Sequence, residues 1–275
     1  NRHNPGNVKY KTPQLEHILD VTNGCIVYQE QVMQICRELA GFSYGQADLV
    51  RRAMSKKKHD VMEKERQHFV HGFLEQVEGI DFENKVKLGI RDNRYDAMVP
   101  QVVSALRLKG RVHAFEAQLA RAHTKKQLKF TLPGPMTIID TVADRFYGDK
   151  VQLAFAFAEL LNQEALALQA DGVDIIQFDE PAFNVYMQEA ADWGVKALER
   201  AAQGLTCKTA VHICYGYGIQ ANKDWKNTLG EEWRQYEKVF PALARSTIDQ
   251  VSLECIHSHV PPELMQLLVG KDVLV

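Results

Sequence analysis

The stretch of sequence that decides the fold is VDIIQFDEP, residues 173–181. Its apolar residues do not alternate regularly with polar ones, and Asp179, Glu180 and Pro181 end the run. A short apolar run of this kind, bounded by polar residues and proline, is typical of a strand inside a parallel sheet. We therefore expect a parallel α/β fold with this strand in it.

Similar units follow one another from about Lys126 onward. Apolar runs predict strands at 129–132, 173–178, 209–213, 248–253 and 272–275, and helical patterns occur at 151–170, 193–202, 230–243 and 262–268. Strands that are each followed by a helix predict a parallel sheet. A TIM-type (β/α) barrel fits this order best, and a doubly wound sheet is the alternative.

The first part of the chain has a different pattern. Residues 1 to about 72 predict helices at 26–39, 45–55 and 59–70, with a basic run at 51–58. Two β-like runs, 85–90 and 98–106, predict a hairpin at about 85–110. We therefore expect a helical segment over 1–72 and a separate α/β domain over 73–275 that carries the hairpin.

Composition excludes several classes of protein. Of 275 residues, 45 % are hydrophobic and 25 % are charged, and the formal net charge is −2. The sequence has no apolar run of the roughly 18 residues that span a bilayer, and its charge gives no overall attraction for nucleic acid. Five cysteines without a C-x-x-C pair favour a reducing, cytoplasmic setting. Because the chain starts at Asn1 and ends at Val275 within an apolar run, we expect a fragment.

Polar side chains collect where the predicted strands end. His212 and Cys214 are two residues apart, so on a strand they share one face, and Glu254 ends the next strand. Imidazole, thiolate and carboxylate are ligands that zinc accepts, and three of them leave a position open for a substrate. His257 and His259 are alternative ligands, proton carriers or exposed loop residues.

The acidic pair Asp179 and Glu180 has two interpretations. Either carboxylate could cap the following helix, or the pair could belong to a reactive site at the strand end. The sequence contains neither a phosphate-binding glycine loop nor a G-x-S-x-G nucleophile motif, which argues against nucleotide and serine hydrolases.

These motifs resemble cobalamin-independent methionine synthases of the short, core type. The resemblance covers about 66–275 and is carried by GIDFEN (79–84), IRDNRYD (90–96), LPGPMT (132–137), IIQFDEPA (175–182), VHICYG (211–216) and VSLEC (251–255). It implies an incomplete TIM-type (β/α) barrel, preceded here by the helical N-terminal segment, that transfers a methyl group to homocysteine. It also implies zinc bound by His212, Cys214 and Glu254, with Asp179 holding the amine of homocysteine.

The sequence departs from this family in ways that affect the chemistry. The family's fourth zinc ligand is a cysteine on a later strand that this chain does not reach, and Cys255 is a poor substitute because it neighbours Glu254. The family's tryptophan near the folate is replaced within IIDT, residues 138–141. The methyl donor is therefore either methyl-folate or another compound, and we expect weak or absent activity from this chain.

Residues 1 to about 72 resemble an internal piece of the bacterial DNA polymerase III α subunit. The resemblance is carried by CIVYQEQVMQI (25–35) and GQADLVRRAMSKKK (45–58). It implies that Arg51 and Arg52 approach an incoming nucleotide, whereas the residues alone also allow a solvated basic helix end. The alternatives to a methyltransferase are thus a DNA-binding fragment and a non-functional chimera of two proteins.

Overall fold

The chain divides into two compact units, residues 1–72 and 73–275. The computed structural model describes residues 15–22, 24–25, 29–38, 73–216, 220–255 and 258–274. In the first unit it describes helix α1 (Glu16–Leu19), the 3-10 turn η3 (Asp20–Thr22) and helix α2 (Gln29–Glu38). The helices predicted at 45–55 and 59–70, with Arg51 and Arg52, lie outside the described residues.

A buried side-chain amide connects α1 and α2, the two α-helices described in the first unit. Gln31 of α2 is 5 % exposed, and its Nε2 donates to the carbonyl of Ile18 at 3.1 Å and to Thr22 Oγ1 at 2.7 Å. A polar group buried in this way keeps its hydrogen bonds, so α2 is held in one orientation against α1. Helix α2 lies within the stretch 26–39 that was predicted to be helical.

The second unit combines a parallel sheet with an antiparallel hairpin. Its described elements are β1 (Val77–Ile90), β2 (Tyr95–Leu108), α5 (Ala114–His123), β3 (Lys129–Pro133), α6 (Pro135–Ile139), β4 (Ala143–Asp144), α7 (Lys150–Ala170), β5 (Ile175–Asp179), η4 (Pro181–Asn184), α8 (Met187–Glu189), a π-helical turn η5 (Ala190–Gly194), α9 (Val195–Ala201), β6 (Lys208–Ile213), α10 (Gln220–Lys226), α11 (Tyr236–Arg245), β7 (Gln250–Leu253), η6 (Pro262–Leu268) and β8 (Asp272–Leu274).

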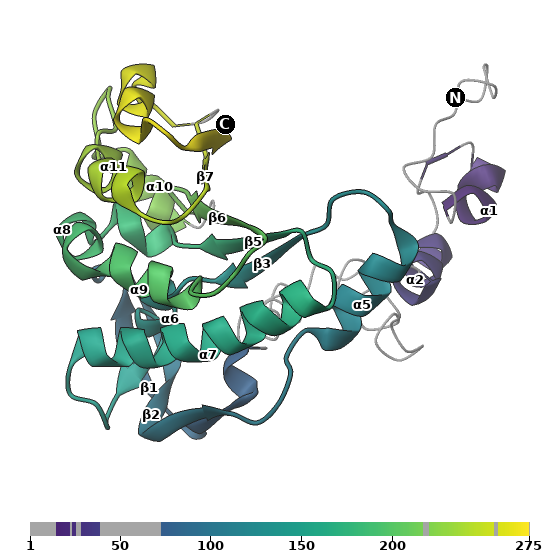
Figure 1. Cartoon of the computed structure of the whole chain (residues 1–275), viewed down its shortest axis with the longest axis horizontal. Coiled ribbons are helices and arrows are strands. Elements are labelled where there is room, and N and C mark those ends of the chain that lie inside the picture. The colour runs from purple at the N-terminus through teal and green to yellow at the C-terminus, as the bar shows by residue number, and fades with distance from the viewer. Residues whose placement is uncertain are drawn as a thin grey trace. The chain divides into compact units, whose positions relative to one another are not determined.

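The parallel sheet confirms the predicted α/β fold. Its five strands run in the order β3-β5-β6-β7-β8, all parallel (Figure 1). Within the described residues β3 and β8 are the two edges, so hydrogen bonds do not close the sheet into a barrel. The register aligns Asp179 with His212 and His212 with Ser252, which places the ends of β5, β6 and β7 side by side.

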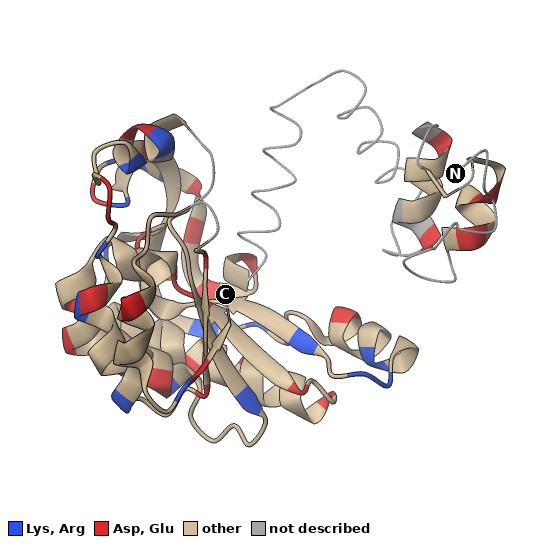
Figure 2. Ribbon diagram, turned by 90° about the horizontal axis from the view of Figure 1, so that it is seen from above, with Lys and Arg blue, Asp and Glu red and all other residues tan. Residues whose placement is uncertain are grey.

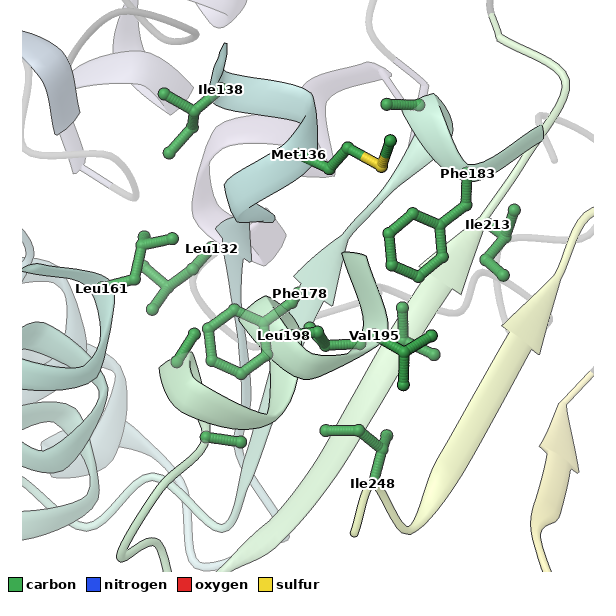
Figure 3. Packing of buried hydrophobic residues seen from close by; sticks show 14 of the residues in the cluster. Leu132, Met136, Ile138, Leu161, Phe178, Phe183, Val195, Leu198, Ile213 and Ile248 are labelled. Atoms are coloured by element: carbon green, nitrogen blue, oxygen red, sulfur yellow. The ribbon is translucent and has the colours of Figure 1, made fainter. Parts of the chain in front are cut away.

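Helix α7 shows how the sequence forms the layer that covers the sheet. The side chain of Asp149 accepts a hydrogen bond from the amide of Gln152 at 2.8 Å, which caps the first turn. The helix ends before Gly172, whose φ of +93° suits a residue without a side chain. Its buried residues join a core between sheet and helices that includes Leu132, Leu161, Phe178 and Leu198 (Figure 3). The helix predicted at 151–170 is confirmed.

One predicted helix is wrong at its start. Residues 230–243 were expected to be helical, but α11 begins at Tyr236. Gly230 has a φ of +77°, and the indole of Trp233 donates to its carbonyl at 3.3 Å. The segment before α11 therefore folds back and buries Trp233, which is 5 % exposed, against Tyr215. The centres of the two rings are 4.7 Å apart. Tertiary packing of an aromatic residue has overridden the local helical pattern.

The hairpin consists of β1 and β2, which pair antiparallel and are longer than the runs 85–90 and 98–106. Strand β4 adds to β2 in parallel, through Gln101 with Ala143 and Val102 with Asp144. This small sheet thereby connects the hairpin to the segment that leads from α6 into α7.

Charged residues of both signs are distributed over the described part of the second unit (Figure 2). This distribution agrees with the near-neutral net charge of −2. Among the described residues, no helix has both the length and the apolar character that crossing a membrane requires.

Candidate functional site

The site lies where β5, β6 and β7 end next to one another. Asp179 is the last residue of β5, His212 is near the end of β6, and Cys214 and Glu254 directly follow β6 and β7. The structure thus places the four predicted site residues together at the carboxyl end of the sheet, as expected for neighbouring parallel strands.

His212 is oriented by its neighbour on β7. Its Nδ1 lies 3.2 Å from Ser252 Oγ. When Nδ1 shares a hydrogen bond with this hydroxyl, Nε2 is the ring nitrogen that can bind a metal or exchange a proton. Ser252 was not among the predicted site residues, although it stands within the motif VSLEC.

Cys214 is surrounded by charged groups. Burial raises the pKa of its thiol, the negative charges of Asp179 and Glu254 raise it further, and the positive charge of Arg91 opposes them. A buried thiol with a raised pKa stays protonated and is a weak nucleophile by itself. It becomes a good ligand when a cation replaces the missing solvation.

The chemistry of the donors His212, Cys214 and Glu254 suits zinc. Within the described residues, which exclude 217–219 and 256–257, no three side chains of His, Cys, Asp or Glu come close enough to one point to hold a metal ion. The three donors are therefore neighbours at the strand ends without being gathered into a finished coordination shell.

Asp179 is held in place by its own strand. The amide Nε2 of Gln177, two residues earlier on the same face, donates to Asp179 Oδ1 at 2.8 Å. Burial raises the pKa of Asp179, while this hydrogen bond and the charges of His212 and Lys129 lower it. The carboxylate interacts electrostatically with His212 and Cys214, and its chemistry suits a cationic group.

Glu180 does not cap the helix that follows it, so that interpretation is wrong. It is fully buried, and it accepts hydrogen bonds from the amides of Met136 (2.9 Å) and Thr137 (2.8 Å) and from Thr137 Oγ1 (2.8 Å). These groups form the start of α6, so Glu180 caps the helix before it in the chain. A side chain at Gly134 would collide with the Glu180 carboxyl group, which explains the glycine in LPGPMT.

The turn of the hairpin supplies a cation, Arg91, which was predicted only as part of the motif IRDNRYD. Arg91, Asp92 and Asn93 have φ values of 54°, 56° and 60°, a left-handed conformation that is costly for residues other than glycine. Arg91 forms a salt bridge with Asp140, and the backbone amide of Asp92 donates to Tyr186 Oη at 2.8 Å. Tyr186 in turn donates to Asp140 at 2.6 Å. This network holds the strained turn beside the site.

A large part of the chain matches a known protein family. Residues 55–221, more than half of the chain, match the family described as "Cobalamin-independent synthase, Catalytic domain". This chain belongs to that family. The resemblance that the motifs indicated is therefore confirmed.

A solved member of this family has the same fold. The structure of a B12-independent methionine synthase from Shewanella sp. W3-18-1 in complex with selenomethionine is 56 % identical, with a TM-score of 0.73. The match covers 75 % of this chain and 60 % of that chain. The chain thus spans about 60 % of the length of this family member.

The N-terminal unit matches a different family. Residues 1–77 match the finger domain of the bacterial DNA polymerase III α subunit. The α subunit of Staphylococcus epidermidis RP62A is 41 % identical over 124 residues, which are 45 % of this chain and 10 % of that protein. That of Staphylococcus aureus Mu50 is 59 % identical over 71 residues, 26 % of this chain and 7 % of that protein. The chain spans a tenth or less of these polymerases.

A cavity of about 510 Å³ adjoins the family motifs at 90–96 and 132–137. Its lining combines Met136, Tyr186 and Asn93 with charged residues of both signs: Lys87, Arg145, Lys150, Asp92, Asp140, Asp144 and Glu189. A partly apolar cavity of this size suits a small organic molecule.

The remaining candidates from the sequence have other surroundings. His259 is exposed, its ring lies 5.4 Å from that of Trp233, and its carbonyl accepts from the Trp233 amide at 2.8 Å, so it is a loop residue beside an aromatic side chain. His257 lies outside the described residues. Cys255 is partly buried against the core, and burial raises the pKa of its thiol.

Proposed function

We propose that this chain binds homocysteine and transfers a methyl group to its sulfur to give methionine, with zinc held by His212, Cys214 and Glu254. The observation that carries the proposal is the alignment of these donors at the ends of neighbouring strands in a chain of this family. Among the described residues these side chains are not gathered at one point, so in this proposal His212, Cys214 and Glu254 would hold the metal only after their side chains move closer together.

The similar solved protein supports the choice of substrate. Its title names a complex with selenomethionine, an analogue of the product, and 56 % identity makes a shared ligand class a reasonable proposal for this chain. Asp179 is the carboxylate that would hold the amine of homocysteine, since Gln177 fixes it and it lies at the same end of the sheet as Cys214.

The proposed reaction is a methyl transfer in which one bond forms and one breaks. The homocysteine thiol gives up its proton, its sulfur attacks the methyl carbon of the donor, and a carbon–sulfur bond forms. The donor leaves with the electron pair of its bond to that carbon and takes up a proton, which balances the one lost by the thiol. When bound, zinc would lower the pKa of the substrate thiol and fix its position. In this proposal His212, held by Ser252, positions the metal, and Asp179 positions homocysteine through its amine. Arg91 adds positive charge near Cys214.

We propose the cavity of about 510 Å³ as the place for the methyl donor, methyl-folate or another compound. Its apolar residues suit the body of an organic donor, and its mixed lining of three basic and four acidic residues suits polar groups on that donor. The open edges of the sheet support the further proposal that this chain is a weak enzyme.

The absence of a disulfide among Cys207, Cys214 and Cys255 supports a cytoplasmic location.

Similarity of the N-terminal unit to a polymerase finger domain favours a second candidate function. Residues 1–72, through Arg51 and Arg52, would then contact DNA or a nucleotide. The two matched families overlap only over residues 55–77, which supports the proposal that the chain is a chimera of two proteins.

Zinc content tests the proposed site. We expect purified wild-type chain to hold about one zinc ion by atomic absorption, and Cys214→Ser to lose it because a serine hydroxyl is a poor zinc ligand. The matched control is Cys207→Ser, since Cys207 precedes β6 and lies at its opposite end. A Cys214→Ser variant that keeps its zinc would contradict the ligand assignment, and Cys207→Ser should keep both zinc and any methionine formation.

A further inference from the structure

The backbone that carries His212 and Cys214 is fixed by hydrogen bonds to successive carbonyl groups. Donors from five residues in different parts of the fold converge on it. The carbonyl of His212 accepts from the Glu180 amide at 2.8 Å, that of Ile213 from Tyr236 Oη and the Glu254 amide, both at 3.3 Å, that of Cys214 from Asn184 Nδ2, and that of Gly216 from Lys226 Nζ at 3.1 Å. The end of β6 therefore has little freedom to rotate its peptide planes.

Asn184 holds the carbonyl of Cys214 itself. It ends η4, the turn that follows the motif IIQFDEPA, and its side chain is almost fully buried, with 2 % exposure. Its Oδ1 has no hydrogen-bond partner among the described residues. Burying an amide with half of its capacity unused is costly, and an apolar residue of the same size would avoid that cost. Packing alone therefore does not account for an asparagine here.

The segment that follows Cys214 also has little free space around it. Gly216 has a φ of +76°, and a side chain there would come within 2.8 Å of the amide nitrogen of Asn222. Asn222, on α10, is 7 % exposed. The segment from Cys214 to Gly216 thus approaches two buried asparagines, of which Asn184 makes the direct bond to Cys214.

We infer that Asn184 is a positioning residue for Cys214. Through the carbonyl bond it fixes the peptide plane after Cys214 and so the direction in which the thiol is presented. This inference rests on the proposed function, in which Cys214 binds zinc. Groups that orient metal ligands from outside the coordination shell contribute strongly to metal affinity, typically 10–100-fold.

Cobalt binding tests this role without relying on turnover. Co²⁺ is titrated into metal-free full-length chain, and the affinity and the thiolate-to-cobalt absorption band are recorded for the wild type, Asn184→Leu, Asn184→Ala and Cys214→Ser. Asn162→Leu is the matched control, because buried Asn162 (8 % exposed) also donates to backbone carbonyls, those of Ala201 at 3.0 Å and Gln203 at 2.6 Å, away from the site. Tryptophan fluorescence verifies that each variant is folded.

We expect both Asn184 variants to bind Co²⁺ about 10–100-fold more weakly and with a shifted thiolate band, while Asn162→Leu matches the wild type. Wild-type affinity and spectrum in a folded Asn184 variant would overturn the inference, as would an equal loss in Asn162→Leu. A wild-type chain that binds no Co²⁺, or a Cys214→Ser chain that binds it normally, would overturn the proposed metal site and the inference with it. A normal wild type with unaffected Asn184 variants would leave the metal site standing and remove only the role of Asn184.

Discussion

Glu180 combines full burial with an ionisable group at the start of a helix. Burial raises its pKa from 4.5 to about 7, although the hydrogen bonds from Thr137 and Met136 and the charge of Arg91 oppose the shift. A carboxyl group whose pKa is higher in the folded state stabilises the fold fully below pH 4.5, and this contribution is lost as pH rises through about 7. Glu180 therefore makes the free energy of unfolding fall as pH rises from 4.5 to about 7.

We predict that the stability advantage of the wild type over Glu180→Gln falls by about 2 kcal/mol between pH 5 and pH 7.5, because the glutamine cannot ionise. Urea unfolding at both pH values, followed by tryptophan fluorescence, measures it. Comparing the two proteins cancels the opposite contribution of His113, whose pKa burial lowers. An advantage that stays constant or grows with pH would contradict the prediction.

The parallel strands could be predicted because each is a short apolar run, and the positions of the candidate site residues because they lie at the ends of those runs. Other features depend on contacts between distant residues. Glu180 caps α6 from more than 40 positions away, and nothing in its local sequence distinguishes it from a cap of the next helix. Helix α10 was not predicted, because its sequence QANKDWK is mostly polar and its buried residue is Asn222. The bond of Asn184 to the Cys214 carbonyl and the salt bridge of Arg91 with Asp140 likewise form only when the chain is folded, so local sequence does not predict them.

The hairpin turn and α10 are joined by a stacked pair. The guanidinium carbon of Arg94 lies 3.1 Å from the centre of the Trp225 ring, and burial lowers the pKa of Arg94 to about 10. We predict that Arg94→Ala lowers the free energy of unfolding by about 1–2 kcal/mol, since a desolvated cation–π pair is lost. Arg94→Lys should recover only part of it, because an ammonium group cannot stack as a planar guanidinium does.

Urea unfolding checks this prediction, with Lys87→Ala as the control on the same hairpin. Lys87 pairs with Asp96 at 2.7 Å, but both side chains are more than half exposed (70 % and 56 %), so this pair contributes little. Equal effects of Arg94→Ala and Lys87→Ala would show that the stacked pair has no special role. Hydrogen exchange should also quicken in α10 of Arg94→Ala alone.

At the scale of the whole molecule, the two compact units provide separate cores and separate family matches. All three tryptophans, Trp193, Trp225 and Trp233, belong to residues 73–275, so their fluorescence reports the unfolding of that unit. We predict that removing residues 1–72 changes the Tm of this signal by less than about 2 °C, which for a unit of this size corresponds to under about 1 kcal/mol. A chain of residues 55–275 is the control, because 55–77 matches both families. If removal of 1–72 instead lowered the Tm by about 5 °C or more, the two units would be one cooperative structure, and the proposal that the chain is a chimera would fail.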